Sequence, residues 1–99
     1  MDFNIYYHKD SLDDLEGIKK KSISDSKIIL NKIESILQHN PFPFGSTIKR
    51  LKNIQPPLYR LRINALQSYR VFYRIIGNSI YVLKIVPKKE VNKILNRYF

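Results

Sequence analysis

The sequence predicts an α+β fold in which an N-terminal strand and a two-helix hairpin pack on an antiparallel β-sheet. In the first forty residues, apolar side chains recur at helical spacing after one short alternating segment. In the second half, alternating apolar runs are separated by turn residues, as expected of consecutive strands. The chain is 99 residues long and 43% hydrophobic, which suits one domain over residues 1–99 with a modest core. The expected order is β-α-α-β-β-β, with room for a short closing helix.

The N-terminal elements are predicted from alternation and from helix-capping residues. Residues 3–8 alternate weakly between apolar and polar side chains and predict the first strand. Ser11 is expected to cap a helix over about residues 11–20, because its hydroxyl can accept a hydrogen bond from a free backbone N–H. Asp13 and Asp14 then fall in the first turn, where the helix dipole favours negative charge.

A second helix is predicted to begin at a Ser22 or Ser24 cap and to end at Asn40, because a residue before proline avoids the helical conformation. The connection between the two helices is very short, so they should form an antiparallel hairpin. Their apolar side chains fall at helical spacing. In the second helix these side chains are Ile29, Leu30, Ile33, Ile36 and Leu37.

The segment 40–57 holds four of the five prolines and predicts a loop. The apolar side chains expected to hold this loop against the core are Phe42, Phe44, Ile48 and Leu51. Three strands are predicted next, over residues 57–63, 68–76 and 79–86. Gly77-Asn78 predicts a tight hairpin turn, because both residues tolerate positive φ. The last strand is apolar on both faces and should lie inside the sheet, and a short basic helix is expected within residues 88–99.

Four arginines lie on two neighbouring predicted strands. Because side chains alternate faces along a strand, Arg60 and Arg62 share one face of the first. Arg70 and Arg74 share one face of the second, while most tyrosines fall on the core side with the aliphatic residues. We therefore expect the arginines to emerge together on an open face of the sheet. Guanidinium groups stay charged and offer a planar fork of donors, so this face suits phosphate.

Charge is unevenly distributed along the chain. Residues 1–40 carry six Lys/Arg and seven Asp/Glu, whereas residues 41–99 carry twelve Lys/Arg and only one acid, Glu90. The formal net charge of the whole chain is +10. A half this basic predicts a polyanionic partner, which is either a nucleic acid or an acidic protein segment.

Several classes of protein are disfavoured by composition. The chain has no cysteine, so it has neither disulfides nor thiolate metal sites, and its two histidines, His8 and His39, fall at the ends of predicted elements. We expect no metal and no cofactor. No apolar run is long enough to cross a membrane, and the N-terminus lacks the features of a signal peptide, so a cytoplasmic location is expected.

The segments "LYRLRI", "SYRVFYRI" and "IYVLKIVPKKEV", which follow two helices and a "KRLK" lead-in, resemble the RelE/ParE toxin superfamily. The resemblance covers nearly the whole chain and implies a RelE-like fold. Members are small basic toxins of type II toxin–antitoxin pairs. The RelE branch cleaves messenger RNA in the ribosomal A site, and the ParE branch inhibits DNA gyrase. The resemblance therefore implies a ribosome-dependent endoribonuclease with an acidic antitoxin as partner. The alternatives are a ParE-like gyrase inhibitor and a non-catalytic relative that binds RNA or the ribosome.

RelE-type cleavage uses no metal, because the ribose 2′-OH attacks the adjacent phosphate. The resemblance places Arg70 against the scissile phosphate, and Arg60 and Arg62 at positions where RelE has two lysines. Lys89, in the basic pair after the last strand, and Tyr98, the nearest counterpart of a C-terminal tyrosine, complete the expected catalytic set. The other expected RNA- or phosphate-binding residues are Lys49, Arg50, Lys52, Arg74, Lys84 and Lys88. Arginine cannot serve as a general base, so the groups that move the proton stay open.

Overall fold

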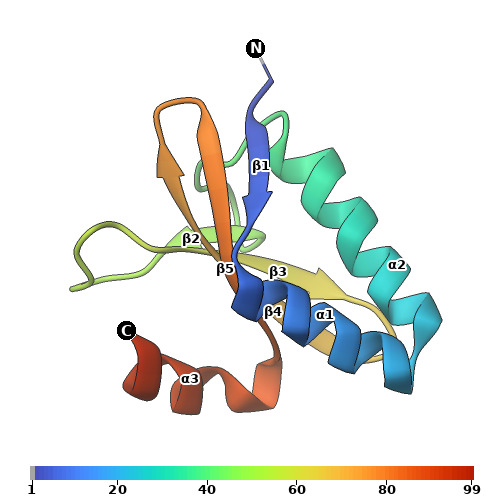
Figure 1. The fold of residues 1–99 in the computed structure, drawn as a ribbon. Helices are drawn as coiled ribbons and strands as arrows, with labels where there is room; N and C mark the ends of the chain where they lie inside the picture. The colour runs from blue at the N-terminus through green and yellow to red at the C-terminus, as the bar shows by residue number, and fades with distance from the viewer. Residues whose placement is uncertain (1) are drawn as a thin grey trace.

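The computed structural model describes residues 2–99, and its centre is a five-stranded sheet with the order β1-β5-β4-β3-β2 (Figure 1). The strands are β1 (Asn4–Tyr7), β2 (Ile48–Arg50), β3 (Tyr59–Asn64), β4 (Ser68–Ile76) and β5 (Ser79–Pro87). The helices are α1 (Lys9–Lys21), α2 (Ile23–Lys32) and α3 (Val91–Tyr98). One π-helical turn, Ile33–Leu37, extends α2, and a 3₁₀ turn, Lys88–Glu90, precedes α3. The predicted α+β class and the closing helix are confirmed.

The sheet departs from the prediction in two places. It is not antiparallel throughout, because β1 pairs in parallel with β5, from Asn4 opposite Ser79 to Tyr7 opposite Val82. The segment 40–57 is not entirely loop, because β2 pairs antiparallel with β3. A three-residue strand is too short to show the alternation that reveals a strand in sequence. The parallel pair joins segments more than 70 residues apart in the sequence, so no local pattern indicates it.

The main core lies between the sheet and the α1–α2 hairpin. As strand alternation predicts, Leu61, Ile63 and Val71 point to this side and are buried against Ile29 and Ile33 of the second helix. Tyr73 lies on the same side, and its hydroxyl donates a 2.6 Å hydrogen bond to the carbonyl of Pro41. This bond holds the segment after α2 against the sheet, where it positions the loop that leads to β2.

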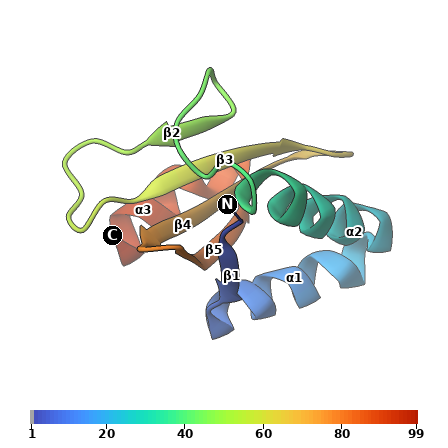
Figure 2. The ribbon, with the colours of Figure 1, turned by 90° about the horizontal axis from the view of Figure 1, so that it is seen from above.

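The opposite face of the sheet is not open, contrary to the expectation from sequence. Leu58, Phe72 and Val86 form a second buried cluster there. Phe72 lies between Arg70 and Arg74 on β4, so the arginine-bearing face also contains an apolar side chain that must be covered. Figures 1 and 2 show α3 lying apart from the α1–α2 hairpin. The side chains packed over this second cluster are Leu51, Ile54, Leu83, Val91, Ile94, Leu95 and Phe99.

The start of α1 also differs from the prediction. The helix begins at Lys9, and its cap is His8, whose Nδ1 accepts from the backbone N–H of Asp10 at 3.1 Å. Ser11 lies inside the helix, buried, with its hydroxyl donating to the carbonyl of His8. Asp13 and Asp14 are therefore not capping residues. Ser22 caps α2, as one of the two predicted alternatives.

Asp13 and Asp14 instead make ion pairs. Asp13 pairs with Lys9 one helical turn earlier, at 2.8 Å on the surface. Asp14 reaches the sheet, where its two carboxylate oxygens accept from Lys84 Nζ at 3.1 Å and from the backbone N–H of Ile85 at 2.9 Å. Asp14 thus joins α1 to β5 beside the irregularity in the β4–β5 pairing.

Among the described residues, Asp25 is the one buried carboxylate, with 1% of its surface exposed. It connects α2 to the turn between β3 and β4. Its Oδ2 accepts from the Tyr69 hydroxyl and its Oδ1 from the backbone N–H of Leu66, both at 3.2 Å. Its own backbone N–H donates to the capping hydroxyl of Ser22. Asp25 therefore contributes to the helix cap through its backbone N–H, and its side chain holds the turn and β4 to α2.

One further expectation from sequence was wrong in part, and the predicted Gly77-Asn78 turn is confirmed. Phe42 and Phe44 are largely exposed, although the Phe42 ring does meet the edge of Phe3 at 5.8 Å between centroids. Of the four apolar side chains expected to hold the loop, Ile48 is buried in the main core and Leu51 is partly buried against the second cluster. In the predicted Gly77-Asn78 turn, Gly77 alone adopts positive φ, at 60°.

Candidate functional site

Three arginines form the centre of the candidate site, and we call Arg60, Arg62 and Arg70 the arginine cluster. Arg60 and Arg62 lie on β3, and Arg70 lies on β4. Arg62 is directly opposite Arg70, and Arg60 is opposite Phe72, so all three side chains leave the same face of neighbouring strands. The strands are held from the other face by the main core, which makes this spacing rigid.

The cluster concentrates positive charge without a compensating acid. Burial, and then the positive charges of Arg60 and Arg62, lower the pKa of Arg70, whose residue is only 7% exposed. Burial, and then Arg62, lower the pKa of Arg60 in the same way. Among residues 2–99, the ion pairs involve lysines and histidines and no arginine. A bound anion would therefore offset the cost of burying these charges and reduce the repulsion within the cluster.

The loop before β2 orients two of the three guanidinium groups. Arg60 Nη2 donates to the carbonyl of Ser46 at 2.9 Å, and Arg62 Nη2 donates to the hydroxyl of the same serine at 3.0 Å. Arg70 Nη1 donates to the carbonyl of Tyr69 at 3.1 Å. The buried Nε of Arg60 has no partner within residues 2–99. Each guanidinium keeps further N–H donors for a ligand. No sequence pattern indicated Ser46, because the fold alone brings it to these arginines.

The predicted basic residues on and after β2 are placed differently from one another. Lys49 is opposite Arg60, so its exposed side chain extends the arginine cluster along the same face. Arg50 is opposite Tyr59 and therefore leaves the other face of the sheet. Lys52 is exposed in the loop that follows. Of the three, the structure brings only Lys49 to the cluster.

Lys88 and Lys89 follow β5 in the 3₁₀ turn, and both are exposed. The turn comes just after Val86, which lies opposite Arg70. The basic pair therefore starts from the end of the sheet where Arg70 lies, at the beginning of α3.

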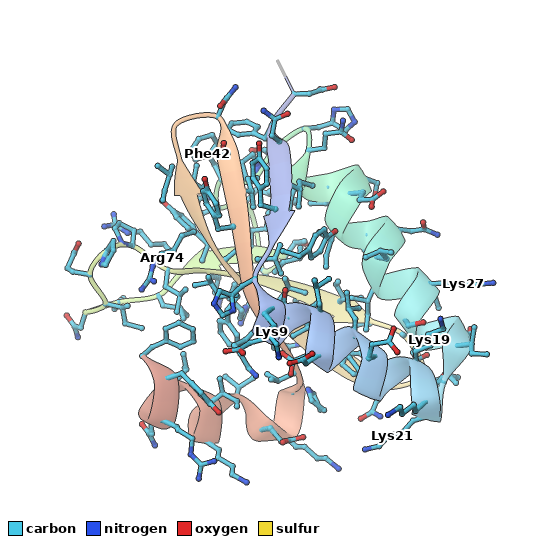
Figure 3. All side chains as sticks on the ribbon, in the orientation of Figure 1. Lys9, Lys19, Lys21, Lys27, Phe42 and Arg74 are labelled. Atoms are coloured by element: carbon cyan, nitrogen blue, oxygen red, sulfur yellow. The ribbon has the colours of Figure 1, made fainter. Side chains whose placement is uncertain are left out.

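Arg74, Lys84 and Tyr98 gather at the other end of α3. The Arg74 guanidinium lies over the Phe99 ring, 5.8 Å from its centroid, and Figure 3 shows it near the C-terminal end of α3. Lys84 Nζ lies 5.2 Å from the centroid of the Tyr98 ring and is ion-paired with Asp14. These contacts place Tyr98 beside Lys84 and near Arg74. Arg74 is four residues from Arg70 along β4, so Tyr98 lies away from the arginine cluster. Lys84 has an acidic partner already, unlike the arginine cluster.

Most tyrosines were expected on the core side of the sheet, but Tyr6 and Tyr81 lie on its other face and are exposed. Tyr6 is 50% exposed and Tyr81 is 39% exposed, and their rings stack at 5.4 Å between centroids. They lie opposite each other on β1 and β5. Because that parallel pairing was not predicted, neither was this pair of rings.

The chemistry that the cluster offers is anion binding and charge stabilisation. Its groups are donors only, and guanidinium does not act as a proton acceptor at neutral pH. Within residues 2–99, no group of three or more His, Cys, Asp or Glu side chains could hold a metal ion. In the same range, no helix is both long and apolar enough to cross a membrane.

Comparison with known proteins identifies the fold. No model of a known protein family matches the sequence, and no curated protein sequence does either. Among solved structures, a mutant of the E. coli toxin RelE in its free state has a TM-score of 0.68 at 13% identity, with all of both chains covered. RelE in the archaeal RelE–RelB complex of Pyrococcus horikoshii has a TM-score of 0.64 at 25% identity, covering 89% of this chain and 97% of that chain.

A third structure, a YoeB/ParE toxin from Agrobacterium tumefaciens, has a TM-score of 0.67 at 21% identity, covering 85% of this chain and 96% of its own. These structural neighbours are toxins or parts of toxin–antitoxin complexes. The predicted resemblance to the RelE/ParE toxin superfamily is thereby confirmed in the fold.

Proposed function

We propose, from this RelE-type fold and its uncompensated arginine cluster, that the chain is the toxin of a toxin–antitoxin pair. It acts in the cytoplasm on ribosome-bound messenger RNA, which it cleaves without a metal ion. The observation that carries the proposal is the cluster itself. Three guanidinium groups on adjacent strands have no acidic partner among residues 2–99, and burial and mutual repulsion both favour a phosphate there.

In the proposed reaction, the ribose 2′-oxygen attacks the adjacent phosphorus and the bond to the 5′-oxygen breaks. The products are a 2′,3′-cyclic phosphate and a 5′-hydroxyl. Arg70 and Arg62 stabilise the negative charge that builds on the phosphate oxygens, as preorganised donors do. The proton of the 2′-hydroxyl passes to an acceptor on the ribosome or the substrate, and the 5′-oxygen takes up a proton from the same surroundings, because the arginine cluster holds no acceptor.

A cleavage assay on translating ribosomes tests this function. The purified chain, free of antitoxin, is expected to cut messenger RNA, and Arg60→Ala/Arg62→Ala is expected to reduce the cutting rate by about 10²-fold or more. Lys20→Ala/Lys32→Ala removes two positive charges from exposed positions on the helices and serves as the matched control. It should cleave at nearly the original rate. Intact message with folded protein would contradict the proposal.

A non-catalytic relative is the second candidate, because the described residues around the cluster offer no general base. It predicts ribosome binding that weakens with salt and leaves the message intact. A DNA supercoiling assay in the same series separates both from a ParE-like inhibitor, which would block gyrase and leave RNA uncut.

The antitoxin is proposed to dock partly in an apolar groove on the helical side of the molecule. The groove has a volume of about 600 Å³ and runs between α1 and α2, with Leu12, Ile23 and Leu30 exposed along it. Tyr7 lines the groove; burial, and then Glu34, raise the pKa of Tyr7 to about 12, and its buried hydroxyl has no partner within residues 2–99. An amphipathic segment would fill the groove with apolar side chains and leave its polar face to solvent.

The salt dependence of the binding rates should separate the electrostatic attraction of the antitoxin from its apolar packing in the groove. Because the chain carries a net charge of +10, we expect salt to slow association with an acidic antitoxin much more than it speeds dissociation. Lys19 and Lys27, labelled in Figure 3, line the same groove. Lys19→Ala/Lys27→Ala should reduce the salt dependence of the association rate, whereas Ile23→Ala should raise the dissociation rate and keep that dependence. Stopped-flow binding over a range of salt measures both, and an association rate insensitive to salt would contradict the prediction.

A further inference from the structure

A small cavity lies at the C-terminal end of α3, at the other end of that helix from the 3₁₀ turn and Arg70. Its volume is about 200 Å³, compared with roughly 30 Å³ for one water molecule in the liquid. Its walls come from the start of α1, from β4 and β5, and from the last two residues of the chain. Tyr98 and Phe99 contribute aromatic rings, and Arg74 and Lys84 contribute positive charge.

The polar groups of this cavity suit a neutral ring better than a phosphate. Arg74 lines the cavity, and its guanidinium group supplies N–H donors. Asp10 adds an acceptor and a negative charge that would repel phosphate. His8 uses Nδ1 as an acceptor in capping α1, which leaves its Nε2 as an N–H donor. Lys84 is already paired with Asp14. Donors, an acceptor and ring faces together match the edge and face of a nucleobase.

A stacking surface adjoins the cavity. Arg74 on β4 lies directly opposite Tyr81 on β5, and Tyr81 lies opposite Tyr6 on β1, so the three side chains form one row on one face. The two tyrosine rings stack on each other and remain exposed. Two residues after Tyr6, His8 reaches the cavity itself. Exposed rings beside an arginine are the usual platform for unpaired bases.

We propose that Tyr6, Tyr81 and the cavity around Arg74 bind an unpaired nucleobase of single-stranded RNA. The proposal rests on the proposed function for the identity of RNA as the ligand. It adds a subsite on the same sheet face as the arginine cluster. Arg70 and Arg74 are four residues apart on β4, which corresponds to about 13 Å along a strand. Because α3 covers Phe72 between these two positions, one RNA strand that contacts both places passes around α3, with a phosphate at the cluster and a base at the tyrosines.

The test compares two probes that have equal charge. One is a short fluorescently labelled single-stranded RNA, and the other is a ribose-phosphate strand of the same length without bases. Tyr6→Ala/Tyr81→Ala is expected to weaken binding of the RNA about 5- to 100-fold and to leave binding of the abasic strand nearly unchanged. Tyr6→Phe/Tyr81→Phe keeps the rings and should bind both probes like the original chain. Thermal unfolding of each variant confirms that the fold is retained.

A second variant guards against a folding defect in the double alanine form. Arg74→Lys keeps the charge and removes the planar set of guanidinium donors at the cavity, so it should weaken binding of the RNA several-fold and change binding of the abasic strand much less. Equal losses for both probes, or no loss for either, would overturn the proposal. So would unchanged RNA affinity together with weakened antitoxin binding, since the surface would then be a protein site. The assay measures binding without ribosomes or cleavage. Its outcome therefore does not depend on whether the protein has the proposed enzymatic activity.

Discussion

Replacing Arg70 by methionine is expected to reduce RNA cleavage by about 10²- to 10³-fold and to leave the folded chain at least as stable as before. Arg70 is 7% exposed, has two arginines beside it and lacks an acidic partner in the described residues. Its charge is therefore a cost to the free protein and a benefit only when phosphate is bound. Methionine keeps most of the volume and removes the charge, so the free energy of unfolding should rise by about 0.5–2 kcal/mol.

Two measurements on the same variants check this prediction. Urea unfolding gives the stability, and the ribosome assay gives the rate of cleavage. Arg97→Met, on the exposed surface of α3, is the control and should change neither quantity much. Arg70→Lys keeps a charge and loses the planar fork, so partial activity is expected. A large loss of stability in Arg70→Met would show that Arg70 is a structural residue, and the functional account of the cluster would fail.

Asp25→Ala is expected to have the largest effect on folding, lowering the free energy of unfolding by about 2–4 kcal/mol. The carboxylate accepts from the Tyr69 hydroxyl and from the Leu66 N–H, and both donors would lose their partner. Burial first, and then the hydrogen bond to Asp25, raise the pKa of Tyr69, which agrees with a phenol held as a neutral donor. The turn between β3 and β4 would then lose its tie to α2.

Urea unfolding of Asp25→Ala, Asp25→Asn and Asp13→Ala separates this role from a general charge effect. Asp25→Asn keeps one acceptor oxygen and should lose much less stability than Asp25→Ala. Asp13→Ala removes an exposed carboxylate from the Lys9 pair and should change stability only slightly. Equal effects at Asp13 and Asp25 would contradict the importance of the buried contacts.

The sequence predicted those elements whose evidence is local. Alternation on β3 and β4 correctly divided their side chains between two faces, and it placed Arg60 and Arg62 together. The apolar spacing of α2 likewise predicted the helix, and Ser22, one of the two predicted caps, begins it. Each of these patterns extends over consecutive residues, so backbone geometry alone connects it to structure.

Contacts between distant segments could not be predicted in this way. Ser46 orients Arg60 and Arg62 because β2 pairs with β3, and nothing near Ser46 indicates that pairing. The cover that α3 gives to Phe72 likewise depends on how the chain returns to the sheet. Tyr98 was expected near the reactive phosphate by position in the chain, yet it lies with Lys84 because α3 runs toward Arg74.

The parallel pairing of β1 with β5 also governs when the protein can finish folding during its synthesis. β1 can pair with β5 only after β5 has been synthesised. β1 therefore joins the sheet late, although it precedes the other four strands in the sequence. α1 and α2 can form early, but their apolar faces lack a sheet until the C-terminal half has emerged. The basic face, built from β3 and β4 and closed by α3, is completed at the same late stage. A nascent chain therefore acquires its stable fold and its basic face together, only after β5 and α3 have been synthesised.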